Sequence, residues 1–109
     1  MNTADTEVAL LTRLQEWFLS ECNEDWEHTY GFKLDTLDNP GWTFEADLAE
    51  TEWAGIEVAR ERVERSEFDW VQYEISDDKY VACGGPLNLV EMLRTFFAVL
   101  EKLKGENVA

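Results

Sequence analysis

His28, the only histidine of the chain, is the residue whose type most directly suggests catalysis, because an imidazole is the commonest general base in proteins. A hydrolytic triad would also need an activated nucleophile beside it. No nucleophile-elbow pattern surrounds Ser20, Ser66 or Ser76, and Cys83 has no activator in the sequence other than a distant encounter with His28. We therefore predict no catalytic residue, and a small enzyme that uses His28 remains an alternative.

Two further stretches contain residue types that bind ions. Asp25, Glu27 and His28 carry ligand atoms, but neighbours one and three positions apart on an extended chain do not converge on one metal ion. The stretch Cys-Gly-Gly-Pro at 83–86 precedes an expected helix, whose first N–H groups attract anions. It lacks the lysine and the spacing of a phosphate-binding loop, and a turn from strand to helix needs glycines in any case. The sequence thus predicts no metal site and no cofactor.

The charge of the chain indicates which partners it attracts. The formal net charge is −15, and eleven acidic residues stand against one basic residue, Lys33, between Glu16 and Glu52. Such a field repels nucleic-acid phosphates and anionic membrane surfaces, and it draws cationic partners towards the protein. A purely solubilising role for the acidic surface is the alternative. We expect a basic protein partner, with no direct nucleic-acid binding and no membrane binding.

The chain carries no sign of export or membrane insertion. Its first seven residues lack the basic and apolar pattern of a signal peptide, and no apolar run approaches the length of a membrane span. Without an export signal, two distant thiols, Cys22 and Cys83, are expected to be reduced core residues rather than a disulfide. These features predict a cytoplasmic protein, and 109 residues suit a single domain over 1–109.

Apolar periodicity predicts a helix at each end of the chain. Over 7–22 a period of 3.6 residues gives an amphipathic helix that Asp5 or Thr6 caps. Its apolar stripe comprises Val8, Leu11, Leu14, Phe18 and Cys22, widened by Leu10 and Trp17. Over 87–104 a broad apolar stripe predicts a second helix, with capping-box spacing between Asn88 and Glu91 and with Gly105 as its stop.

A period of two predicts strands between these helices. One hairpin is expected over 30–37 and 42–49, with the turn residues Asp-Asn-Pro-Gly at 38–41 and with Tyr30, Phe32 and Leu34 reaching the core. A second hairpin is expected over 69–76 and 79–83. The segment 56–65 fits a helix or an outward-facing edge strand, and we favour the strand. The fold class is therefore α+β, an antiparallel sheet of four to five strands with both helices packed on one face.

The strand residues that point away from the helices form the candidate partner-binding site. This face combines carboxylates with one large aromatic side chain, as a surface for a basic protein does. We assign partner binding to Asp35, Glu45, Asp47, Trp70, Gln72 and Glu74, with Lys33 and Thr43 on the same face. A position of Trp70 under a loop or at a sheet edge is the alternative.

The stretch WEHTYGFKLDTLDNPGW at 26–42, with DWVQYEI at 69–75, the junction GGPLNL at 84–89 and the closing apolar helix, resembles the immunity protein 53 family of bacterial polymorphic toxin systems. The resemblance covers about 14–103 and is weakest over 52–64. It implies an α+β protein that binds and neutralises a cognate toxin domain without chemistry of its own. Many such toxins are nucleases with cationic clefts, which an acidic face would fit.

Two other functions remain alternatives at this point. One is an acidic adaptor or nucleic-acid mimic that inhibits a different basic protein, and the other is the enzyme that uses His28. For His28 itself we favour a structural role, a local hydrogen bond at the start of the first strand. The resemblance identifies neither the toxin nor the contact residues.

Overall fold

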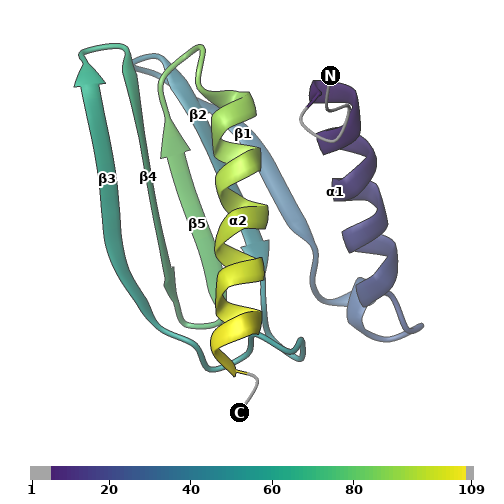
Figure 1. Ribbon diagram of the computed structural model, residues 1–109. Helices are drawn as coiled ribbons and strands as arrows, with labels where there is room; N and C mark the ends of the chain where they lie inside the picture. Colours follow the sequence, from purple (N-terminus) through teal and green to yellow (C-terminus); the bar gives the residue numbers. More distant parts are fainter. Residues whose placement is uncertain (1–5, 108–109) are drawn as a thin grey trace. The chain divides into compact units, whose positions relative to one another are not determined.

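A computed structural model describes residues 6–107, which divide between two compact units, Met1–Gly31 and Phe32–Ala109 (Figure 1). The first unit contains a helix and a 3-10 turn, and the second contains a five-stranded antiparallel sheet and a helix. The elements are α1 Glu7–Glu21, η2 Trp26–His28, β1 Phe32–Leu37, β2 Gly41–Asp47, β3 Val58–Ser66, β4 Asp69–Ser76, β5 Lys79–Gly84 and α2 Leu89–Asn107. The predicted α+β class, with an antiparallel sheet and a helix at each end of the chain, is confirmed.

Helix α1 begins at the predicted cap. The hydroxyl oxygen of Thr6 accepts a hydrogen bond from Ala9 N at 3.1 Å, while Asp5, the other predicted cap, lies outside the described residues. The predicted buried stripe is wrong in part, because Leu10, Leu14 and Trp17 are the buried side chains. These three also follow a helical period, and the apolar arc of α1 is too wide for sequence alone to select one edge of it. The other edge is exposed at Val8, Leu11 and Phe18, and Cys22 is half-buried.

The chain after α1 folds back through hydrogen bonds from side chain to backbone. The side-chain oxygen of Asn23 accepts from Asp25 N and Trp26 N, and the Glu27 carboxylate accepts from Asn23 N and Glu24 N. These bonds satisfy donors that a helix end and a tight turn would leave unpaired. Trp26 is thereby buried, with its ring edge-on to Trp17 at 6.1 Å between centroids. Tyr30, predicted as a strand residue, precedes β1 and contacts the Trp26 ring instead.

The strand order is β1-β2-β5-β4-β3, with every neighbouring pair antiparallel. The first hairpin joins β1 to β2, and the second joins β4 to β5 through a turn at Asp77 and Asp78, both of which have positive φ. The ambiguous segment 56–65 lies largely in β3, which is the edge strand paired with β4. Five of the nine residues of β3 are charged, and its pairing with β4 is interrupted by two register shifts.

Helix α2 covers one face of the sheet and builds the core of the second unit (Figure 1). The Phe96 ring lies 5.1 Å from the Phe44 ring and 5.0 Å from the Tyr80 ring, centroid to centroid. Trp53, in the loop between β2 and β3, donates its indole N–H to the carbonyl oxygen of Leu100, which fastens this loop to the helix. The placement of α1 on the same face of the sheet stays a prediction.

Three details of the second unit differ from expectation. Leu34 was expected in the core but is 43% exposed, because β1 is an edge strand and α2 lies over β5 in the middle of the sheet. Gly105 was expected to end α2, but the helix continues to Asn107. The expected capping box is replaced by a bond between side chains, in which the amide of Asn88 donates to the Glu91 carboxylate at 3.0 Å.

Candidate partner-binding surface

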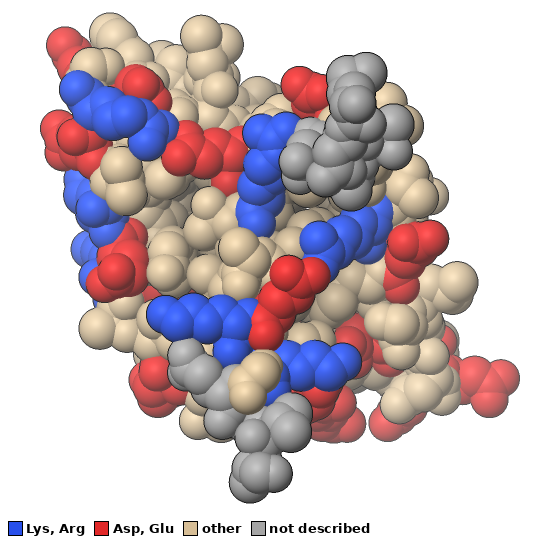
Figure 2. Space-filling model, in the orientation of Figure 1, with Lys and Arg blue, Asp and Glu red and all other residues tan. Residues whose placement is uncertain are grey.

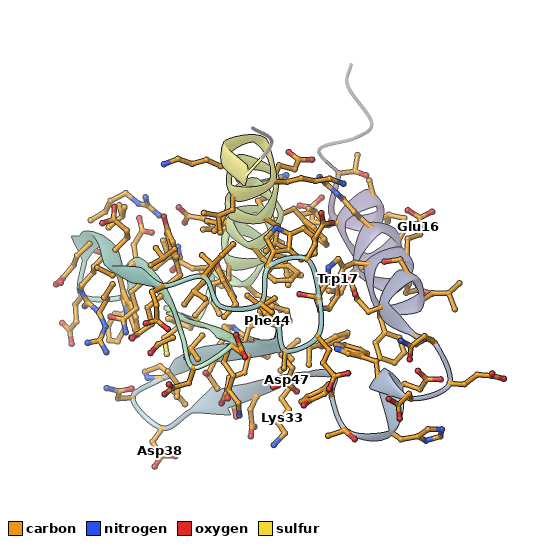
Figure 3. All side chains as sticks on the ribbon, turned by 90° about the horizontal axis from the view of Figure 1, so that it is seen from below. Glu16, Trp17, Lys33, Asp38, Phe44 and Asp47 are labelled. Atoms are coloured by element: carbon orange, nitrogen blue, oxygen red, sulfur yellow. The ribbon has the colours of Figure 1, made fainter. Side chains whose placement is uncertain are left out.

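All six predicted contact residues belong to the sheet face opposite α2, which we call the open face. Figure 3 shows this separation, with Phe44 on the α2 side and Lys33 and Asp47 on the other. The strand register gives the reason, because Phe44 pairs with Ala82 in the core while its neighbour Glu45 pairs with Val81 on the open face. The positions are Asp35 in β1, Glu45 and Asp47 in β2, and Trp70, Gln72 and Glu74 in β4.

The six residues do not form one continuous cluster, because β5 separates β2 from β4. Glu45 and Glu74 both pair with Val81, from opposite sides, so roughly 10 Å separates their backbones, twice the spacing of neighbouring strands. In the next row Cys83 stands between Thr43 and Gln72. The thiol of Cys83 is free and half-buried, so the expected core position is wrong for it as for Cys22.

Basic residues lie close to several of the carboxylates on the open face. Arg60 binds Glu74 at 2.8 Å, and the Lys79 ammonium lies 4.0 Å from Asp47. Lys33 stands opposite Glu45 in the register of β1 and β2. Together with the pair of Arg62 and Glu64 at 3.0 Å, the face carries five acidic and four basic residues. From the sequence, the basic residues of β3 and β5 were not placed on this face. The alternation of Arg60, Arg62 and Glu64 in β3 indicated that these side chains share one face of the strand.

Trp70 is half-buried, and its ring is covered. The guanidinium carbon of Arg62 lies 4.6 Å from the ring centroid, and the same guanidinium donates to the side-chain oxygen of Gln72 at 2.6 Å and to Glu64 at 3.1 Å. The stacked arginine desolvates one face of the indole and leaves its own charge exposed. The predicted aromatic anchor is therefore an Arg62–Trp70 pair with a cationic surface.

The ion pairs of the open face are exchangeable. The side chains of Arg60 and Glu74 are 61% and 31% exposed, and exposed pairs of this kind contribute about 0–1 kcal/mol each and weaken with salt. A partner that brings its own charges can therefore replace them at low cost. The α2 side likewise presents Lys and Arg interspersed with Asp and Glu (Figure 2).

The end of the sheet at which β2 and β5 meet the turn 77–78 is the more acidic region. Two ammonium groups, Lys79 and Lys104, lie near this turn and the loop 48–57. Six carboxylates lie in or beside the same two segments, which gives a local charge of −4: Asp47, Glu50, Glu52, Glu57, Asp77 and Asp78. Two of the carboxylates also hold the backbone, since Asp78 accepts from Gly55 N at 2.7 Å and Glu57 accepts from Asp77 N at 3.3 Å. These two carboxylates therefore fix the turn and the loop next to it.

The region of His28, the candidate for catalysis, follows helix α1 in the first unit. His28 ends η2, its side chain is exposed, and its backbone N–H donates to the Asp25 carbonyl at 3.1 Å. The local hydrogen bonds that we expected from this histidine are made instead by Glu27. Backbone N–H groups of Glu27 itself, Asn23 and Glu24 lower the pKa of this carboxylate. Among residues 6–107, no three His, Cys, Asp or Glu side chains are placed to hold one metal ion.

The fold is that of a small α+β protein, with an antiparallel sheet, a helix at each end of the chain and exposed ion pairs on the open face. The family described as immunity protein 53 matches residues 11–101. The chain therefore belongs to the immunity protein 53 family. Comparisons with curated proteins and with solved structures gave no significant match. Within the described chain, neither helix has the length and apolar character needed to cross a bilayer.

Proposed function

We propose that the chain binds and neutralises a toxin domain that has a basic surface, and that it does so by occupying this surface without catalysis. The observation that carries the proposal is the family match over residues 11–101. The net charge of −15 supports the basic character of the partner, because opposite fields accelerate association.

The open face supplies the charged contacts in this proposal. Asp35, Glu45 and Glu74 meet Lys and Arg of the toxin, and the exposed pairs of Asp47 and Glu74 exchange their present partners for those of the toxin. Because each existing pair is weak, the exchange costs little free energy. Trp70 and Gln72 contact the partner together with Arg62, which covers the indole.

Co-expression tests the proposal. The C-terminal domain encoded by the reading frame immediately upstream is expressed in a host cell, alone or together with this chain, and growth is measured. We expect growth to stop with the toxin domain alone and to be restored by the chain, and we expect the two proteins to co-purify as a complex. An unrelated acidic protein of similar size is the control. If negative charge alone were enough for protection, this control would restore growth as well as the chain does. Absence of both protection and a complex would contradict the proposal, as would capture of a different basic protein without protection.

A further inference from the structure

Two large apolar side chains are exposed at one end of the second unit. Phe68, in the turn between β3 and β4, is 51% exposed, and Leu87, just before α2, is 94% exposed. Figure 1 shows that this turn and the start of α2 lie at the same end of the sheet. Single exposed apolar side chains are common on protein surfaces, but two of them at one end of a sheet are candidates for contact with a partner. We call Phe68, Leu87 and the turn residues between β3 and β4 the tip.

The two segments of the tip are in direct contact. Gly85 N donates to the Trp70 carbonyl at 3.0 Å, and a Cβ atom at Gly85 would lie 2.4 Å from the carbonyl oxygen of Phe68. Only glycine allows this approach of two backbones. The glycine therefore brings the segment that precedes α2 against the turn that carries Phe68.

A polar network around the buried side chain of Asn88 links the segments of the tip. Asn88 is 6% exposed, and its side-chain amide donates to Asp69 and to Glu91 at 3.0 Å each. The guanidinium of Arg65 donates to the same two carboxylates, so β3, β4 and α2 are tied together at this point. A preorganised surface loses little conformational entropy when it binds. Exposed apolar side chains on such a support are suited to act as anchors.

The charge around the tip indicates the chemistry of its partner. Three carboxylates, Glu67, Asp69 and Glu91, stand against one guanidinium, Arg65, which gives a local charge of −2 beside the two apolar side chains. On the open face, in contrast, the charges are nearly balanced and the indole of Trp70 is covered. The tip thus matches a partner that has an apolar pocket with a basic rim.

We propose that Phe68 and Leu87 are the apolar anchors of the complex and insert into a pocket of the toxin domain whose rim carries Lys or Arg. This inference rests on the proposed function, and it moves the centre of the interface from the open face to the tip. Interfaces take most of their affinity from a few desolvated anchors, and surrounding charges mainly set the rate of association. Trp70 lies two residues after Phe68, so the open face continues from the tip and supplies these charges.

Affinity measurements with the purified toxin domain from the upstream reading frame test the proposal. We expect Leu87→Ala and Phe68→Ala each to weaken binding at least about tenfold, mainly through faster dissociation. Val8→Ala is the matched control, because Val8 is 74% exposed on α1, and it should leave affinity unchanged. Thermal unfolding of each variant reports whether the fold is intact. The nearly complete exposure of Leu87 makes its variant the decisive one.

The outcomes separate this inference from the proposed function. If the unaltered chain neither binds nor protects against the toxin domain, both are overturned. If it binds and protects but Leu87→Ala and Phe68→Ala bind within about twofold of it, only the role of the tip is overturned. Self-association of the chain that is lost in Leu87→Ala while toxin affinity is unchanged would also overturn it, because the tip would then serve a second copy of the chain.

Discussion

The guanidinium of Arg62 lies over the indole ring of Trp70, with 4.6 Å between the guanidinium carbon and the ring centroid. The contact joins the edge strand β3 to β4 on the open face, in register with the pairs of Arg62 with Gln72 and of Glu64 with Trp70. A cation over an aromatic ring is attracted by the electron-rich face of the ring. The pair therefore stabilises the edge of the sheet as well as shaping the binding surface.

A double-mutant cycle measures this contact. We expect Arg62→Ala and Trp70→Leu to show a coupling of about 0.5–1 kcal/mol in the free energy of unfolding, determined by urea denaturation. Arg60→Ala combined with Trp70→Leu is the control, because Arg60 binds Glu74. That cycle should give a coupling near zero. Equal coupling energies in the two cycles would show that the coupling does not come from the contact between Arg62 and Trp70.

Charge reversal on the open face tests electrostatic steering. We expect Glu45→Lys combined with Asp47→Lys to slow association with the toxin domain by about tenfold, and we expect the difference to shrink at high salt. Stopped-flow mixing gives the rate constant. The pair Glu7→Lys and Glu16→Lys on α1 changes the net charge by the same amount. If both pairs slow association equally, net charge matters and the open face does not.

The contact at Gly85 predicts a local effect of a single methyl group. We expect Gly85→Ala to lower the free energy of unfolding by about 1–3 kcal/mol, because the new Cβ would meet the Phe68 carbonyl oxygen at 2.4 Å and the Asn88 side-chain oxygen at 2.7 Å. Gly31→Ala is the control, since a Cβ there meets no atom within 4 Å. It should change stability by less than about 1 kcal/mol. Urea denaturation of both variants decides the matter.

Asp69 makes stability depend on pH. Hydrogen bonds from Arg65 and, to a smaller extent, from Asn88 lower its pKa below the ordinary value of 3.8. The stabilisation is therefore complete above that value and is lost as the pH falls through the lowered pKa of the folded state. We expect Asp69→Asn to be less stable than the unaltered chain at neutral pH and to lose less stability on acidification. Glu67→Gln, in the turn that precedes Asp69, is the comparison. Parallel pH profiles for Asp69→Asn and the unaltered chain would contradict the prediction.

Substitution of His28 separates an inhibitor from an enzyme. We expect His28→Ala to leave protection against the toxin domain unchanged and to alter the free energy of unfolding by less than about 0.5 kcal/mol, because this side chain is exposed. Growth under co-expression and urea denaturation supply the two measurements. Loss of protection with intact stability and intact toxin binding would indicate catalysis.

The sheet could be predicted from the sequence because the residues of its strands alternate between the two faces. Phe44 and Ala46 are fully buried and Glu45 is not, and each fact follows from a period of two. The buried side of helix α1 was harder to predict, because its apolar residues occupy a wide arc. Tertiary contacts, such as that of Trp17 with Trp26, determine which edge of this arc is buried.

The candidate site could be predicted only in part, for a different reason. The faces of Glu74 and Trp70 were predictable, but their cover by Arg60 and Arg62 depends on the pairing of β3 with β4, whose register contains two shifts. The tip depends on contacts between the segments 65–69 and 85–91. The sequence suggests the turn glycines of this junction, but not the segment against which they pack.

The charged edge strand β3 has a consequence for the free protein. An unpaired strand edge invites another chain to add a strand, and repeated addition yields polymers. On β3 such an addition would have to accommodate Arg60, Glu61, Arg62, Glu64 and Arg65 as well as the two register shifts. We expect this edge to resist fibril growth, which leaves β1, the other edge of the described sheet, as the edge at which another chain could add before any partner is present.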